Sequence, residues 1–222
     1  MTSAIEKFLD ESAGGPAVSG VLHRPASASG VGVVLAHGAG SNCDAPILRA
    51  LAEAFAETGW TALRCDLPFR QARRNGPPFP ASAAQDRVGL RNAVTALRRM
   101  IPGRVFLGGH SYGGRQASML AASDPALTPA LLLLSYPLHP PRKPEQLRTA
   151  HFPDMRTRAL FVHGVRDPFG SFEEMQAALA LSPAETSLIM IPQAGHELIA
   201  QELLAAAEWA RQTVAAFRAF VQ

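Results

Sequence analysis

Apolar runs alternate with helical patterns along this chain, and the alternation constrains the fold more than any other feature of the sequence. Seven short apolar runs predict strands at residues 18–23, 31–37, 61–66, 104–107, 130–135, 159–163 and 187–191. Helical spacing predicts helices at residues 46–58, 83–100, 113–122, 172–181 and 197–222, with Asp44 as the N-cap of the first and Ile199 on the apolar face of the last. Repeated strand-to-helix order is typical of a mostly parallel sheet covered on both faces, so the predicted class is α/β.

Length and composition indicate one soluble domain over residues 1–222. The chain has 222 residues, of which 47% are hydrophobic and 18% charged, enough to bury a sizeable core. No internal repeat is present, and the proline-rich segment 77–80 is a stiff loop rather than a linker. No apolar run approaches the roughly 18 residues of a membrane span, and residues 1–10 lack the order of a signal peptide. We therefore expect a cytoplasmic protein that does not associate with membranes.

Charge and cysteine content argue against nucleic-acid, metal and nucleotide binding. The net charge is only +3, although almost all of the cationic residues are arginines. Cys43 and Cys65 have no metal-ligand spacing, so we expect two free, packed thiols and no metal. Residues 109–115 nearly match a phosphate-binding loop, but Arg115 stands in place of its lysine and Gln116 in place of its hydroxyl residue. No dinucleotide-binding glycine motif is present either, so no cofactor is expected.

The pentapeptide Gly109-His110-Ser111-Tyr112-Gly113 carries the clearest chemical signal. It directly follows the apolar run 105–107 and directly precedes a predicted helix. A nucleophilic serine of the G-x-S-x-G type needs this context, because its hydroxyl stands at a tight strand-to-helix turn where small neighbours let strand and helix approach. An ordinary glycine-rich turn is the alternative interpretation. The context favours Ser111 as a nucleophile.

A serine hydroxyl is a weak nucleophile at neutral pH and needs a histidine base oriented by an acid. Asp167 follows the predicted strand 159–163, and His196 follows the strand 187–191, so both are expected above Ser111 at the carboxyl edge of the sheet. His196 is also the one histidine after Asp167 in the chain. The weaker candidates for the acid are Asp154, Glu173 and Glu174, none of which directly follows a strand. Turn-forming or capping roles are the alternatives for Asp167 and His196.

Two backbone amides are expected to stabilise the oxyanion of such a reaction. One belongs to Tyr112, the residue after the nucleophile, and the other to the glycine-rich turn 37–40, where Ala39 is the first choice and Gly40 the second. His139 and Gly40 are further candidates for substrate binding. A structural role is the alternative for His139, which has prolines close by.

With these residues placed, the chain resembles the α/β-hydrolase superfamily over nearly its full length. Within it, the phrases at 37–40, 106–113 and 135–140 are similar to those of a small family that contains a testis-expressed hydrolase-like protein and a subunit of the non-specific-lethal histone acetyltransferase complex. The chain is more distantly similar to dienelactone hydrolases, which have cysteine where Ser111 stands. The resemblance implies a three-layer α/β-hydrolase fold with about eight mostly parallel strands, and serine-hydrolase machinery at Ser111, Asp167 and His196.

The predicted function is hydrolysis of a small ester or thioester through an acyl-enzyme on Ser111. Residues 136–158 are too few for a lid, so we expect no cap domain and an open, shallow site. Arg70, Arg73 and Arg74 follow the strand 61–66, where they either bind an acidic substrate group or form a solvated loop. A non-catalytic scaffold or binding subunit on the same fold is the alternative function. A peptidase is disfavoured, because the large gating domain usual for such enzymes has no room here.

Overall fold

The computed structural model describes residues 3–198 and 203–222. Its strands are β1 (Ala4–Asp10), β2 (Val18–Arg24), β3 (Gly32–Ala36), β4 (Thr61–Asp66), β5 (Val105–His110), β6 (Ala130–Leu134), β7 (Arg158–Gly164) and β8 (Thr186–Ile191). Its α-helices are α1 (Pro46–Glu57), α2 (Pro68–Ala72), α3 (Ala83–Met100), α4 (Tyr112–Ser123), α5 (Phe172–Leu179) and α6 (Leu203–Phe220). Single 3-10 turns lie at Pro80–Ser82, Pro125–Leu127 and Phe152–Asp154.

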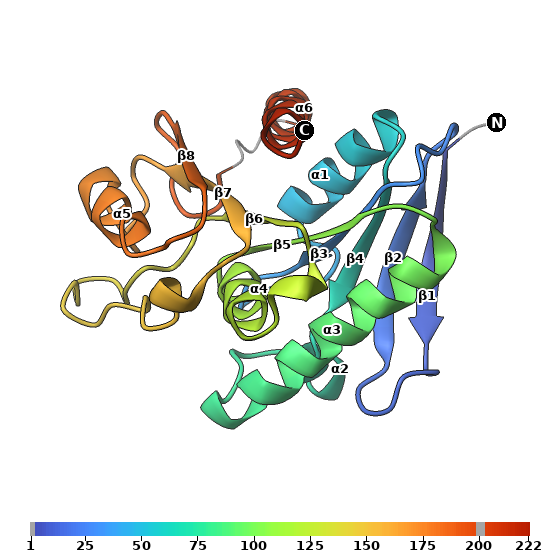
Figure 1. The fold of residues 1–222 in the computed structure, drawn as a ribbon, viewed down its shortest axis with the longest axis horizontal. Coiled ribbons are helices and arrows are strands. Elements are labelled where there is room, and N and C mark those ends of the chain that lie inside the picture. Colours follow the sequence, from blue (N-terminus) through green and yellow to red (C-terminus); the bar gives the residue numbers. More distant parts are fainter. Residues whose placement is uncertain (1–2, 199–202) are drawn as a thin grey trace.

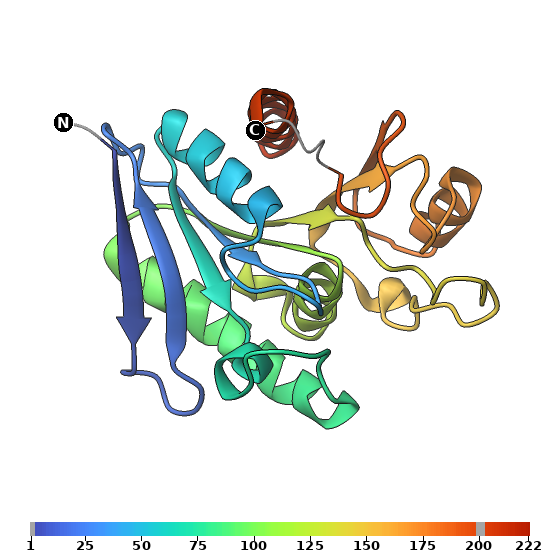
Figure 2. The same cartoon turned by 180° about the vertical axis from the view of Figure 1, so that it is seen from behind.

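All eight strands form one sheet in the order β1-β2-β4-β3-β5-β6-β7-β8. The five pairs from β4 to β8 are parallel, whereas β1 and β2, and β2 and β4, pair antiparallel. The α1 and α6 helices cover one face of the sheet, and α3 and α4 cover the other (Figure 1 and Figure 2). The predicted α/β class, with a mostly parallel sheet between helices, is confirmed.

Two separate hydrophobic cores explain why the central strands are apolar at every position. In β6, Leu131 and Leu133 pack in the core beneath α3 and α4, while Leu132 and Leu134 pack in the core beneath α1 and α6. Successive side chains of a strand point to opposite faces, so a strand covered on both faces needs a continuous apolar run. The strands β3 and β5 show the same alternation, and their parallel pairing brings their carboxyl ends to the same edge of the sheet.

Three local predictions differ from the structure. The strand β1 was not expected, because it lies at the sheet edge with Ile5 and Leu9 exposed and its polar residues give no apolar run. Asp44 does not cap α1, whose N-cap position is held by Ala45 without a side-chain hydrogen bond. The last helix does not begin at Glu197, since residues 196–197 form a turn. The start of the helix before Leu203, including the predicted contact of Ile199, lies outside the described residues.

The loop between β6 and β7 contains one short 3-10 turn and no α-helix, in agreement with the expected absence of a lid domain. No helix in the described part of the chain combines the length and apolar character needed to cross a bilayer. Because the β6 to β7 loop forms no lid, the loops that follow β3, β4, β5, β7 and β8 converge at the carboxyl edge of the sheet without a covering domain.

Candidate active site

Ser111 lies at the turn between β5 and α4, with φ of 51° and ψ of −116°. A non-glycine residue at positive φ is strained and needs close support from its surroundings. Gly109 and Gly113 provide the space for it: a Cβ on Gly109 would lie 2.7 Å from the backbone of Gly113, and one on Gly113 would lie 2.5 Å from the carbonyl oxygen of His37. The strand, tight turn and helix predicted around this pentapeptide are confirmed.

The structure brings Ser111, His196 and Asp167 into one chain of hydrogen bonds. The Oγ of Ser111 lies 2.8 Å from Nε2 of His196, and Nδ1 of His196 lies 2.8 Å and 3.0 Å from the two carboxylate oxygens of Asp167. Asp167 directly follows β7 and His196 follows β8, as the sequence predicted for their positions. The arrangement allows a proton to pass from the serine hydroxyl to the imidazole.

Asp167 is held as a carboxylate although its side chain is 0% exposed. Burial by itself would raise its pKa, but the hydrogen bond and charge of His196, with a further hydrogen bond from the backbone amide of Phe169, hold that pKa below its usual value. A charged acceptor at this position requires a proton on Nδ1 of His196. The Nε2 atom is then left to accept the proton of Ser111.

Two residues that the sequence did not single out hold His196 in place. The Nε2 atom of His110 donates to the backbone carbonyl of His196 at 2.9 Å, and burial keeps the pKa of His110 below its usual value. The ring of Phe169 packs on the His196 imidazole with centroids 4.3 Å apart. His110 directly precedes the serine and Phe169 lies two residues after Asp167, so their nearness to the motifs was the available signal.

The backbone amides of Ala39 and Tyr112 are candidates for binding an oxyanion. Neither amide donates a hydrogen bond to another described residue, and both residues line the same cavity as Ser111. Gly38 brings the loop close to the nucleophile, because a Cβ added there would lie 3.4 Å from the Cβ of Ser111. Two free N–H groups beside a serine hydroxyl are the donors that a tetrahedral intermediate requires.

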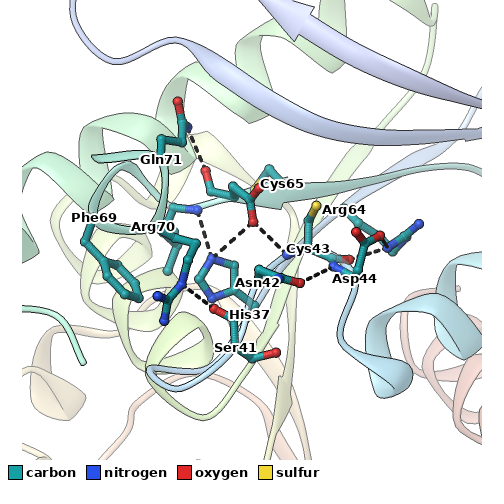
Figure 3. Close-up of polar contacts among 12 residues, drawn as sticks. His37, Ser41, Asn42, Cys43, Asp44, Arg64, Cys65, Phe69, Arg70 and Gln71 are labelled. Carbon is teal, nitrogen blue, oxygen red and sulfur yellow. Dashed lines mark hydrogen bonds and ion pairs between the residues drawn. The ribbon is translucent and has the colours of Figure 1, made fainter. Parts of the chain in front are cut away.

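Arg70 clamps the loop that carries Ala39, as Figure 3 shows for its contact with Ser41. Its side chain is almost completely buried, at 7% exposure, and its three nitrogen atoms donate to five backbone carbonyls. Two of these belong to the loop after β3 and three to the loop after α2: Ala39, Ser41, Arg73, Arg74 and Gly76. Arg70 is thus a structural link between two loops.

This finding corrects the suggestion that Arg70, Arg73 and Arg74 bind an acidic substrate group. The donors of Arg70 are already satisfied by the backbone. Arg73 donates to the carbonyl of Pro77 and stacks over the ring of Phe79, with 4.3 Å between the guanidinium carbon and the ring centroid. Arg74 is exposed, and none of the three lines the cavity beside Ser111.

His37 ties the loop after β3 to the loop after β4 (Figure 3). Its Nε2 atom accepts from the backbone amide of Leu67 at 3.1 Å, so Nδ1 carries the proton and donates to the carbonyl of Gly38 at 2.8 Å. Burial lowers the pKa of His37 and keeps the ring neutral. The neighbouring carboxylate of Asp66 accepts from the amide of Cys43 at 2.7 Å. These hydrogen bonds therefore fix the position of the turn 37–40 against the loop after β4.

The structure decides two expectations for residues near this turn, one against the prediction and one in agreement with it. Asp44 pairs with Arg64 at 3.0 Å instead of capping α1 (Figure 3). The thiols of Cys43 and Cys65 are free and buried, as predicted. Burial raises the pKa of Cys43 to about 12, and raises that of Cys65 further, so both are poor nucleophiles.

A cavity of about 530 Å³ opens beside the Ser111 hydroxyl. Its walls come from the oxyanion turn, the proline-rich loop before α3, the first turns of α4 and the loops after β6 and β7: Ala39, Pro77, Pro78, Phe79, Pro80, Ala83, Ser111, Tyr112, Arg115, Gln116, Met119, Pro137, Arg148 and Phe169. The proline-rich loop, expected only as a stiff connection, forms one wall. No covering domain lies over this cavity among the described residues, and the shallow site expected from the short β6 to β7 loop stays a prediction.

His139 and Gly40, the predicted substrate-binding residues, do not line this cavity. The side chain of His139 is 6% exposed, and its Nε2 atom lies 3.3 Å from a carboxylate oxygen of Glu174, the residue that completes the capping box of α5. Its backbone amide donates to the carbonyl of Phe169. His139 therefore connects the β6 loop to the loop of Asp167 and α5, which is the structural alternative, and Gly40 is exposed at the turn.

Sheet order, strand-to-helix serine turn and loop placement together define the α/β-hydrolase class of proteins. The chain belongs to the family described as "Alpha/beta hydrolase domain", whose sequence profile matches residues 29–222. Within the described residues, no group of three or more His, Cys, Asp or Glu side chains is placed to hold a metal ion. Family and fold indicate a hydrolase.

Several solved structures share this fold. A dienelactone hydrolase from Anabaena variabilis superposes with a TM-score of 0.77 at 23% identity, covering 99% of each chain. An α/β serine hydrolase homologue from Coxiella burnetii has a TM-score of 0.75 at 17% identity, covering 94% of this chain and 97% of its own. An α/β serine hydrolase without lid from Xanthomonas campestris has a TM-score of 0.73 at 18% identity, covering 97% and 94%. At these identities the similarity establishes the fold.

Proposed function

We propose that this protein is a serine hydrolase that cleaves a small ester or thioester through an acyl-enzyme on Ser111. The observation that carries the proposal is the unbroken hydrogen-bond chain from Ser111 through His196 to the buried carboxylate of Asp167. The free amides of Ala39 and Tyr112 beside the serine support it. We further propose that the chain acts as one catalytic domain, related within its family to the small group indicated by the phrase at 135–140.

The geometry fits the two half-reactions of acyl transfer. The Oγ of Ser111 attacks the carbonyl carbon while Nε2 of His196 takes the hydroxyl proton, and the negative oxygen of the tetrahedral intermediate accepts hydrogen bonds from Ala39 and Tyr112. The intermediate collapses as His196 returns the proton to the leaving alkoxide or thiolate. Water then attacks the acyl-enzyme with His196 as base, which releases the acid and restores Ser111.

Labelling with a fluorophosphonate tests the nucleophile directly. We expect the wild type and a Ser123→Ala control to be labelled, because Ser123 lies at the far end of α4 and donates only to the carbonyl of Leu120. Ser111→Ala should not be labelled and should lose hydrolysis of 4-nitrophenyl acetate. Equal labelling of all three proteins would reject Ser111 as the nucleophile. An unlabelled wild type without activity on esters or thioesters would instead support the scaffold alternative.

A further inference from the structure

Two guanidinium groups line the cavity away from the serine. Arg115 lies on the first turn of α4, with its amide donating to the carbonyl of Ser111 at 2.9 Å, and Arg148 lies in the loop between β6 and β7. Among the residues that the structure describes, neither forms an ion pair with a carboxylate, whereas six other arginines do. The two positive charges of this wall are therefore not neutralised by the protein.

Two residues that line the cavity also carry buried donors without a hydrogen-bond partner in the described part of the chain. The buried Nε of Arg115 and the buried Nε2 of Gln116 have no hydrogen-bond partner among the described residues. Gln116 is 0% exposed, and its Oε1 atom accepts from Arg87 at 2.8 Å, which fixes the amide so that its NH₂ group is the free end. A buried donor without a partner is costly. The two residues that carry these donors both line the cavity, so this wall is rich in donors and offers no acceptor for them among the described residues.

Hydrogen bonds within the protein hold Arg148 in position. Its backbone amide donates to Leu138 at 2.8 Å, and its carbonyl accepts from the buried hydroxyl of Tyr136 at 2.7 Å. One guanidinium nitrogen makes a long contact of 3.3 Å to the carbonyl of Pro137, leaving most of its donors available. The loop thus holds Arg148 at the cavity before any ligand binds, which lowers the ordering cost of binding.

The electrostatic environment also favours an anion. Burial first, and then the charge of Arg115, lower the pKa of Arg148, as expected for two cations that repel each other. Two carboxylates of the site are already occupied: Asp86 accepts from the hydroxyl of Tyr112 at 2.7 Å, and Asp167 binds His196. An anion between the arginines would relieve a repulsion that the protein leaves uncompensated.

We propose that this cavity selects substrates carrying an anionic oxygen group, a carboxylate or a phosphate, which Arg115 and Arg148 bind. This inference rests on the proposed hydrolysis at Ser111 and names its substrate class as anionic esters or thioesters. The cavity volume of about 530 Å³ accommodates a small acyl chain with such a group at its end. Phe79 and Met119 supply apolar walls for the connecting carbons.

Matched esters test this selectivity. The 4-nitrophenyl monoester of adipic acid carries a carboxylate on the acyl side, and its methyl-capped diester is the neutral control. 4-Acetoxybenzoate with its methyl ester, and 4-acetoxyphenyl phosphate with phenyl acetate, place a carboxylate or a phosphate on the leaving group. We expect at least one anionic ester to be hydrolysed with a kcat/KM about tenfold or more above its neutral partner, because hydrogen bonds to charged groups are strong.

Variants assign the effect to the two arginines. In Arg115→Gln, Arg148→Gln and the double variant, the anionic-to-neutral ratio of kcat/KM should fall, most in the double variant. Arg142→Gln is the matched control, since Arg142 is an exposed arginine of the same loop and does not line the cavity. A wild-type ratio near one, or a ratio that stays unchanged in the double variant, would overturn the inference while leaving the serine hydrolase proposal intact.

A binding measurement decides the question even if no ester is hydrolysed. Adipate and inorganic phosphate are added to Ser111→Ala at constant ionic strength, and the thermal unfolding temperature is recorded against sodium chloride. We expect at least one of the two anions to raise Tm, and Arg115→Gln with Arg148→Gln in the same background to abolish the rise. No rise with either anion, or a rise that survives the loss of both arginines, counts against the anion site.

Discussion

Two groups of arginines lie at the carboxyl edge of the sheet, and they differ in whether the protein satisfies their donors. Arg70, in the short helix α2, gives its guanidinium to five backbone carbonyls of two loops. Arg115 and Arg148 face the cavity without a carboxylate partner among the described residues, and Nε of Arg115 has no acceptor. Arg70 therefore holds the loops of the site in place, whereas Arg115 and Arg148 are placed to contact a bound ligand.

The comparison teaches that closeness of an arginine to a nucleophile does not indicate its role. From the sequence, Arg70 follows a strand and belongs to a cluster that either binds an acidic substrate group or forms a solvated loop, while Arg115 stands out only as a misfit in a phosphate-loop pattern. Donors and acceptors in the structure give a different assignment, because a buried donor that lacks a partner is an incomplete interaction. A change in each group should therefore produce a different kind of defect.

The largest effect is expected at His196. Changes in either group of arginines can affect hydrolysis only if His196 acts as the base for Ser111. His196→Ala should lower kcat for the best ester by roughly four to six orders of magnitude, because the residues of such a unit act together. The measurement is steady-state hydrolysis beside circular dichroism, which should show a folded protein. A loss of less than tenfold would show that another residue is the base, with His110 as the next candidate. The two arginine groups could then no longer be interpreted through the Ser111–His196 pair.

Stability separates the two groups next. Arg70→Met should lower the free energy of unfolding by roughly 2–4 kcal/mol, because five partly buried carbonyls lose a charged donor. Arg115→Met should change it by less than about 1 kcal/mol, since no protein acceptor of its Nε is lost. Urea denaturation of both variants checks the contrast. Equal destabilisation would show that Arg115 also supports the fold.

A milder change in the clamp should affect the reaction itself. Arg70→Lys keeps the charge but cannot reach five carbonyls, so the loop bearing Ala39 should loosen and kcat should fall roughly tenfold with little change in KM. Arg73→Lys, in the same loop but without a contact to Ala39, is the control. If Arg70→Lys raised KM for anionic esters alone, Arg70 would belong with the ligand-facing group instead.

The smallest effect is a change in titration beside the cavity. Burial first, and then the charges of Arg115 and Arg87 against that of Asp154, lower the pKa of His151 to about 4, while its Nε2 lies 2.8 Å from the hydroxyl of Ser118. Arg115→Gln should raise this pKa, as measured by NMR of the imidazole. His23, whose pKa of about 4 comes from burial and Arg64, should not change. A His151 pKa unaffected by the substitution would mean that the Arg115 charge is already compensated.

The sign of the accompanying stability change follows from the lowered pKa. A histidine whose pKa is lower in the folded protein contributes stability that is complete above the unfolded value of 6.5 and is lost as pH falls toward about 4. Both His151 and His23 act in this window. Arg115→Gln should therefore reduce the loss of stability between pH 6.5 and 4, which urea denaturation at several pH values can follow.

The sequence predicts the parts of this molecule that depend on local pattern. Continuous apolar runs identify β3 to β7 because both sheet faces are buried there, and the glycines around Ser111 identify the turn because no larger residue fits there. The order of serine, acid and histidine along the chain, each after a strand, predicted that Asp167 and His196 lie beside Ser111, where the hydrogen bonds connect them.

Features that depend on pairing across the fold could not be predicted in this way. The edge strand β1 is stabilised by one neighbour and needs no apolar run, so Ala4–Asp10 resembled a polar terminus. The capping role of Asp44 was lost to a partner twenty residues away, Arg64. His139 has a buried imidazole beside Glu174 of α5, and no local motif reveals that contact. Nor does a local motif reveal that the donors of Arg70 have acceptors in the protein, whereas Nε of Arg115 has none among the described residues.

The hydrogen-bond chain of the site also reports on how the molecule must fold. Its members are 85 residues apart from Ser111 to His196 and 29 residues apart from Asp167 to His196, and they meet only after β7 and β8 have joined the parallel sheet. Contacts of such sequence separation form slowly, because the loop-closure entropy precedes their stabilisation. Recovery of hydrolysis during refolding would thus time the completion of the sheet, later than the secondary structure seen by far-ultraviolet circular dichroism.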